Sequence, residues 1–268
     1  LINEHLFDRR NDRMENIFWR ELKDECKYCK EKENLEICKP YFDLCTDILS
    51  FIHSCQGILN KSFVCEIVRH EYARGGEMLH RGFYYPSLFS DLVIGNCSRG
   101  HILKSAPRKA PDYIYSFNKN NQLILSEKLV YGKIGQVEKI IYENHVEYGL
   151  TARVGHESEI CYFTKRCFED GKLMSYVSAL IHPNKKSEQE VIELIIEKYN
   201  YVNGLFASGD LYRFYPSLPS LDHNRYFFER DTDGFLTHYS VKSFKGEMAQ
   251  KGYWDNHIFE IDKSKRRK

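Results

Sequence analysis

The 268-residue sequence predicts an α+β fold, in which an N-terminal helical hairpin precedes a mostly antiparallel β-meander with packed helices. Apolar residues recur at helical spacing up to about residue 60. From Tyr113 onward they alternate with polar residues, as in half-buried strands. Tyr-Pro-Ser-Leu occurs at 85–88 and again at 215–218, within similarly ordered segments, which predicts two pseudo-repeated halves. The predicted units are residues 1–60, 61–186 and 187–268.

The N-terminal hairpin is expected to begin with an amphipathic helix over residues 6–33, where Phe7, Ile17 and Leu22 share one face. Pro40 then favours the start of a second helix, because a first helical turn needs no backbone N–H at that position. The second helix carries an apolar stripe at steps of three, four and seven residues, namely Cys38, Phe42, Cys45, Leu49, Ile52 and Leu59. The two stripes predict an antiparallel helical pair with a broad buried face.

Two further helices are expected, one at the start of each half. Ser62 can cap a helix over residues 63–74. Ser187 and Glu190 have the S-x-x-E form of a capping box, which predicts a second helix from residue 187 to about 203. Its expected buried face is Val191, Leu194, Ile195, Tyr199 and Val202.

The meander is predicted from four segments in which apolar and polar residues alternate on either side of a turn. Asp170-Gly171 and Asp233-Gly234 stand at two of these turns, and Asp-Gly is among the strongest signals of a tight hairpin. The expected hairpins span residues 113–130, 136–154, 160–181 and 225–244, with an edge strand at 257–261. A short buried strand is expected at 92–94.

Composition excludes several classes of protein. The 39 basic and 38 acidic residues leave a net charge of +1, which argues against nucleic acid as a partner. Apolar runs are all shorter than the roughly 20 residues of a membrane span, so no membrane association is expected. Nine cysteines, an odd number without a secretion signal, predict reduced thiols and a cytoplasmic location. Phosphate-loop, dinucleotide and serine-hydrolase motifs are absent, and no cofactor is expected.

Four cysteines suit a metal site by their spacing. Cys26 and Cys29 form a C-x-x-C pair, with Cys38 and Cys45 further along the chain. Zinc needs four thiolate or imidazole ligands, and a zinc-clamped helical hairpin would satisfy this. A second C-x-x-C pair is lacking, however, and Cys38 and Cys45 coincide with the apolar stripe of the second helix. We therefore expect packing in place of metal binding, since buried cysteine behaves as a small hydrophobe.

Two histidine-containing pairs are candidates for acid–base chemistry. His70 precedes Glu71, and His80 lies three residues after Glu77 and directly before Arg81. A histidine beside a carboxylate can transfer protons near neutral pH, so the two pairs could form a site between the halves. With 11 histidines in the chain, the alternative is that they are surface residues or hydrogen-bonded core residues.

Aromatic residues gather before both prolines of the repeated tetrapeptide. The clustered residues are Tyr84, Tyr85, Tyr212, Phe214 and Tyr215. Proline cannot donate to a strand ladder, so each tetrapeptide is expected to end a strand or form a connection. The aromatic rings then either fill the junction between helix and sheet or serve as anchors in a partner-binding groove between the halves.

The segment Tyr226 to Leu236 resembles the Y-x-x-x-x-D-x-x-G-x-L form of YD/Rhs-type hairpins. The chain as a whole is similar in style to immunity proteins of bacterial polymorphic toxin systems. That resemblance implies a cytosolic protein that binds a cognate toxin and covers its active site.

The sequence thus predicts a non-catalytic protein-binding module with a protein partner, in its sharpest form a toxin domain. One alternative is a hydrolase, or an enzyme acting on nucleotides or nucleic acid, with histidine and glutamate as acid and base. The other alternative is a regulatory module stabilised by zinc.

Overall fold

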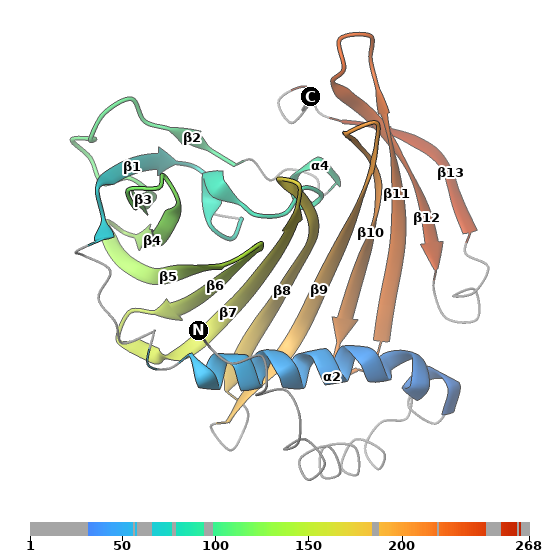
Figure 1. Cartoon of the computed structure of the whole chain (residues 1–268), viewed down its shortest axis with the longest axis horizontal. Helices are drawn as coiled ribbons and strands as arrows, with labels where there is room; N and C mark the ends of the chain where they lie inside the picture. Colours follow the sequence, from blue (N-terminus) through green and yellow to red (C-terminus); the bar gives the residue numbers. More distant parts are fainter. Residues whose placement is uncertain are drawn as a thin grey trace.

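A computed structural model describes residues 32–55, 57, 66–76, 79–93, 99–183, 188–218, 220–244, 253–261 and 263. Within these residues, one 13-stranded antiparallel sheet has the order β13-β12-β11-β10-β9-β8-β7-β6-β5-β4-β3-β1-β2. From β3 to β13 every strand pairs with its neighbour in sequence, so this part is a meander. Figure 1 shows the sheet curling at the end that holds β1 to β5.

The first six strands are β1 (Arg69–Arg74), β2 (His101–Ile102), β3 (Tyr113–Phe117), β4 (Leu123–Val130), β5 (Lys133–Glu143) and β6 (Val146–Arg153). The others are β7 (His156–Glu169), β8 (Lys172–Pro183), β9 (Gln189–Val202), β10 (Leu205–Tyr215), β11 (Ser220–Arg230), β12 (Leu236–Phe244) and β13 (Tyr253–Glu260). The helical elements are α2 (Lys32–Ser54), the 3-10 turn η3 (Gly82–Tyr84) and the short α4 (Ser90–Val93).

One face of the sheet is covered by α2, which lies across the strands (Figure 1). The predicted stripe of the second helix is confirmed in part, because Cys38, Phe42, Cys45 and Ile52 are buried. The helix begins at Lys32, however, so Pro40 lies inside it and not in its first turn. The core between helix and sheet includes Leu150, Phe163, Ala179, Leu194 and Phe214.

The opposite face is covered by residues 79–93, which contain η3 and α4. Successive residues of a strand point to opposite faces, so Leu150 packs below α2 while its neighbour Gly149 lies under Arg81. Farther along the sheet, Phe89 is fully buried among the rings of Tyr199, Phe206 and Phe228. Both faces of the central strands are therefore buried.

The predicted α+β fold with packed helices is wrong. All four predicted hairpins are present, and residues 257–260 of the expected edge strand belong to β13. The expected helix at 187–203 is instead strand β9, and the described part of the expected helix at 63–74 contains strand β1. The short strand expected at 92–94 is replaced by α4, of which Val93 is the last residue. Residues 6–31 of the first expected helix lie outside the described residues.

Strand β9 was predicted as a helix because its buried residues recur at steps of three. Val191 and Leu194 are buried on the α2 side, with a register shift of the β8–β9 ladder between Val191 and Glu193. Glu197 and Tyr199 are buried on the opposite side, where they hydrogen bond with the segment at residues 87–88. A strand buried on both faces and interrupted by a bulge can thus imitate the period of a helix.

The two Tyr-Pro-Ser-Leu tetrapeptides occupy different surroundings, which argues against two pseudo-repeated halves. Ser87 lies off the sheet and is fully buried, where its hydroxyl donates to Glu197. Ser217 is exposed in the turn that follows β10. The predicted unit boundaries at 60/61 and 186/187 stay predictions. No helix in the described part of the chain has the length and apolar character needed to cross a membrane.

Candidate functional site

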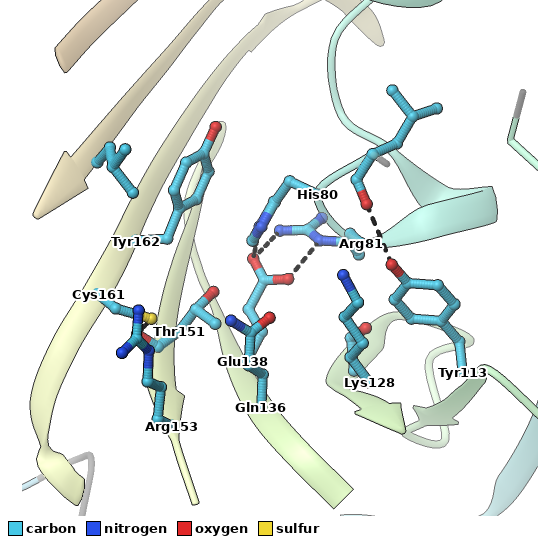
Figure 2. Close-up of a pocket in the computed structure, with 13 residues that line it drawn as sticks. His80, Arg81, Tyr113, Lys128, Gln136, Glu138, Thr151, Arg153, Cys161 and Tyr162 are labelled. Carbon is cyan, nitrogen blue, oxygen red and sulfur yellow. Dashed lines mark hydrogen bonds and ion pairs between the residues drawn. The ribbon is translucent and has the colours of Figure 1, made fainter. Parts of the chain in front are cut away.

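A cavity of about 220 Å³ lies between residues 79–81 and strands β4 to β8 (Figure 2). Two cross-strand rows form its floor. Lys128, Gln136 and Arg153 are paired neighbours on β4, β5 and β6, and so are Ser126, Glu138 and Thr151. Because the rows are two residues apart on each strand, all six side chains lie on the same face of the sheet.

Two tyrosines of β3 hold the segment that covers this cavity. The Tyr113 hydroxyl donates to the carbonyl oxygen of Leu79 at 3.1 Å, and the Tyr115 hydroxyl donates to that of Arg81 at 2.9 Å. Their rings are stacked, with centroids 5.8 Å apart. Arg81 has a φ of 61°, and this left-handed conformation turns the chain into η3. Strand β3 thereby places His80 and Arg81 over the sheet.

Arg81 forms a buried ion-pair network with two carboxylates. Its Nε and Nη2 donate to Glu138 at 2.9 and 2.5 Å, and its Nη1 donates to Glu147 at 2.8 Å. The side chains of Arg81, Glu138 and Glu147 are only 1%, 3% and 4% exposed. Arg166 also donates to Glu147, at 2.9 Å. Charge-assisted and bidentate bonds of this kind are the strong class of protein hydrogen bonds.

The network holds Glu138 in its ionised form. Burial raises the pKa of this carboxyl group, but the charge of Arg81 and the contact with His80 lower it more, so the net pKa lies well below its usual range. His80 Nε2 is 3.1 Å from Glu138 Oε1, and the imidazole ring stacks on Tyr162 with centroids 4.2 Å apart. Figure 2 shows His80 and Arg81 both directed toward Glu138.

Gly149 lies directly beneath this network on β6. A Cβ atom at this position would collide with Glu138 Oε1, Thr164 Oγ1 and Arg81 Nη2. Its φ is not in the left-handed region, so the requirement for glycine comes from space and not from backbone conformation. Nothing in the sequence around Gly149 signals this contact.

Gly149→Ala is therefore expected to lower the free energy of unfolding by about 2–4 kcal/mol, because the added methyl group displaces a buried ion pair. Chemical denaturation followed by circular dichroism measures the change. Gly155→Ala is the control, since a Cβ atom there meets nothing within 4 Å, and its positive φ limits the expected loss to about 1 kcal/mol. Equal losses in the two variants would contradict the steric explanation.

The structure brings together only two of the four candidate acid–base residues. His80 and Arg81 line the cavity, but His70 and Glu71 lie on β1 and are not among its lining residues. His70 Nδ1 is 3.0 Å from Ser116 Oγ. Glu71 accepts a hydrogen bond of 2.5 Å from the Tyr84 hydroxyl and pairs with Arg69. The predicted site of four residues is therefore not assembled.

The five candidate partner-binding aromatics do not share one surface. Tyr212 and Phe214 face α2, where both rings contact Tyr41. On the opposite face of the sheet, Tyr85 lies beside Tyr176. Tyr84 packs edge-on against Tyr115 of β3, and Tyr215 is half-buried at the end of β10. In the described part of the chain, these five rings therefore do not line a common groove of the kind predicted between two halves.

The β4–β5 hairpin exposes an apolar tip. Val130, Tyr131 and Ile134 are 46%, 102% and 39% exposed. Tyr131 and Gly132 have φ values of 51° and 76°, as the type I′ turn of a two-residue hairpin requires. A Tyr-Gly pair at a hairpin turn is visible in the sequence, so this feature could have been found without the structure.

The surroundings of this tip are basic. Gly132 lies against Ala110 of the loop that follows β2, so the hairpin and the loop are neighbours. Residues 99–112 and 128–136 contain six basic residues and one acidic residue, Asp112, a net charge of +5 in a chain whose total is +1. The exposed lysines and arginines of these two segments are Lys104, Arg108, Lys109 and Lys133.

The described cysteines show no metal site. Cys38 and Cys45 are buried on α2 and are not in disulfide bonds, and burial raises the pKa of both. Cys26 and Cys29 lie outside the described residues. In the part of the chain that the structure covers, no group of three or more potential ligands could hold a metal ion. Compared with known proteins, the chain matches no family model and no curated relative.

Proposed function

We propose that this chain is a non-catalytic protein-binding module, and that the β4–β5 tip docks onto an acidic protein surface. The tip consists of Val130, Tyr131 and Ile134, with Lys104, Arg108, Lys109 and Lys133 as its basic surroundings. The observation that carries the proposal is the fully exposed tyrosine in a left-handed backbone conformation.

Tyr131 is a poor residue for its turn. The left-handed conformation costs an ordinary residue roughly 1–2 kcal/mol, and asparagine or aspartate tolerates it better. Among the described residues, two other tight turns between paired strands have consecutive positive φ values, and they begin with Asp170 and Asn203. Because turn geometry disfavours Tyr131 and no packing compensates a side chain that is 102% exposed, binding is the better explanation for its presence.

Tyrosine is a frequent energetic anchor of protein interfaces, where it fills a pocket on the partner. Val130 and Ile134 add exposed apolar surface next to Tyr131, one on each face of the hairpin. The surrounding lysines and arginines favour an acidic partner, because complementary charge accelerates encounter and disfavours wrong partners. More specifically, we propose that the partner is a bacterial toxin domain and that this chain inhibits the toxin by covering its active site.

The alternative of acid–base catalysis has weaker support from the geometry. A general base works best with a pKa near the operating pH, whereas the pKa of Glu138 is lowered. The cavity volume of about 220 Å³ lies below the range of roughly 300–1,000 Å³ typical of ligand pockets. We propose a cytoplasmic location, because none of the described cysteines (Cys38, Cys45, Cys55, Cys161 and Cys167) is in a disulfide bond.

Tyr131→Asn is expected to weaken partner binding at least 30-fold, equivalent to about 2 kcal/mol, because it removes the anchor and leaves a better turn residue. Folding stability should stay unchanged or rise by up to about 1 kcal/mol. The partner is first isolated by affinity capture from extracts of the source cells and identified by mass spectrometry. Isothermal titration calorimetry with the purified partner then measures both affinities.

Val202→Asn is the matched control, because Val202 is 54% exposed beside the turn of the β9–β10 hairpin. It should bind the partner as the wild type does. The proposal fails if the two asparagine variants bind equally well, or if capture yields no partner that binds the purified chain at a defined stoichiometry.

A further inference from the structure

Glu127 of strand β4 is a half-buried carboxylate that makes no hydrogen bond or ion pair within the described part of the structure. Burial raises the pKa of its carboxyl group, and the nearby His70 of β1 opposes this shift without cancelling it. Charged groups that lose part of their water shell are usually paired, because the desolvation is otherwise uncompensated. Glu127 is therefore able to pair with a cation from another molecule.

Glu127 lies in a cross-strand row of apolar side chains, which we name the Glu127 row. Ile114 and Val137 are its paired neighbours on β3 and β5, and Tyr72 on β1 continues the row beyond Ile114. Val137 pairs in turn with Ala152, which belongs to the core below α2, so the row lies on the α2 side of the sheet. Tyr72, Ile114 and Val137 are only half-buried, so another molecule can reach this part of the face.

The Glu127 row continues into the β4–β5 tip. A Cβ atom on Gly135 would lie 3.0 Å from Val130 Cγ2, so Val130 packs over Gly135. Gly135 precedes Val137 by two residues and therefore lies on the same face of β5. Glu127 is three residues from Val130, a separation of about 10 Å along a strand. The exposed tip and the Glu127 row thus form one continuous surface.

We propose that Glu127 pairs with a lysine or arginine of the protein that docks onto the β4–β5 tip. This inference rests on the proposed function and adds to it a charge pattern for the partner. The partner carries acidic residues opposite the basic surroundings of the tip, and one basic residue roughly 10–15 Å from the pocket that holds Tyr131. Ile114 and Val137 suit the aliphatic stem of that residue while its charged head meets the carboxylate. Opposite charges at two places fix the register of docking.

Glu127→Gln tests the pairing, because glutamine keeps the shape of glutamate and removes its charge. Isothermal titration calorimetry with the purified partner should show binding about tenfold weaker than that of the wild type at pH 7.5. Glu229→Gln is the matched control and should bind as the wild type does, since Glu229 is exposed on β11, which six strands separate from β4. Glu127→Gln should unfold at the wild-type temperature or above, because it loses an unpaired, half-buried charge.

The pH dependence of binding distinguishes a charge pair from a purely structural role. Protonation of Glu127 removes the pair, so the affinity of the wild type should approach that of Glu127→Gln as the pH falls from 7.5 to 5. Titratable side chains of β1 and β5 share this face with Glu127, namely His70, Tyr72, Arg74, Lys133 and Lys139. All of them are unchanged in the variant, so the ratio of the two affinities reports on Glu127.

A double-mutant cycle identifies the basic residue of the partner. When the exposed lysines and arginines of the partner are replaced by glutamine one at a time, one replacement should abolish the difference between the wild type and Glu127→Gln. The inference is overturned if no replacement does so, if the ratio of affinities is the same at pH 7.5 and pH 5, or if Glu229→Gln weakens binding equally.

Tyr131→Asn separates this inference from the proposed function. If Tyr131→Asn weakens binding while Glu127→Gln binds as the wild type does, the inference alone is wrong and the tip still docks. If both variants bind as the wild type does, or if capture yields no partner, the proposed function and this inference are both wrong.

Discussion

Arg81→Met is expected to lower the free energy of unfolding by about 3–5 kcal/mol at pH 7, the loss typical of removing one partner from a buried ion pair. Arg81 supplies both strong hydrogen bonds to Glu138 and one to Glu147. Without it, Glu138 keeps only the contact with His80, whereas Glu147 keeps Arg166. Methionine retains much of the volume of arginine. The loss of stability therefore comes mainly from removing the charge and its hydrogen bonds, and less from opening a cavity.

The pH dependence of this loss has a defined sign. In the wild type, the lowered pKa of Glu138 gives stability that is present above the unfolded pKa of about 4.3 and lost as the pH falls toward the native value. In Arg81→Met, burial without the arginine charge raises the pKa of Glu138, so this variant loses stability as the pH rises. The difference between the two proteins should therefore narrow from pH 7 to pH 4.

Urea denaturation at several pH values measures both curves. Lys133→Met, which removes an exposed cation, should change the free energy of unfolding by no more than about 0.5 kcal/mol. A loss below 1 kcal/mol in Arg81→Met, or a difference that grows on acidification, would show that the network does not hold Glu138 ionised.

The parts of the fold that depend on local chemistry were predictable from the sequence. The hairpins from Tyr113 to Ile181 follow from alternating residues and from turn residues such as Asn144 and Asp170, whose positive φ values occur in the structure. Helix α2 follows from its apolar stripe. Strand β9 was not predicted. It is buried on both faces and contains a bulge, so its sequence lacks the alternation of apolar and polar residues from which strands are predicted.

The candidate site depends on contacts between residues far apart in the sequence. The sequence predicted His80 and Arg81 as candidate site residues. Arg81, however, hydrogen bonds with Glu138 and Glu147, which are 57 and 66 residues further along the chain. Glutamates are common in this chain, and nothing local distinguishes these two. The polar rows of β4, β5 and β6 likewise depend on the register of these strands. A shift of one strand by one residue would turn its polar side chains to the other face of the sheet.

Phe214→Ala is expected to lower the free energy of unfolding by about 3–5 kcal/mol, because it opens a cavity in the core between α2 and the sheet. Phe214 is fully buried, with its ring 4.9 Å from that of Phe42 in an edge-on arrangement and 5.5 Å from that of Tyr41. Tyr215→Ala is the matched control on the next residue, which faces the opposite side of the sheet and is half-buried. A loss of about 1 kcal/mol is expected there.

This pair of variants also decides whether Phe214 anchors a partner, as the aromatic cluster before Pro216 predicted. A fully buried ring cannot reach a partner while α2 stays in place, so any loss of binding must come through unfolding. At a temperature where circular dichroism shows Phe214→Ala to be folded, its affinity for the partner should equal that of the wild type. A folded variant that fails to bind would instead require α2 to move aside during recognition, and the anchor would then lie beneath the helix and not on the β4–β5 tip.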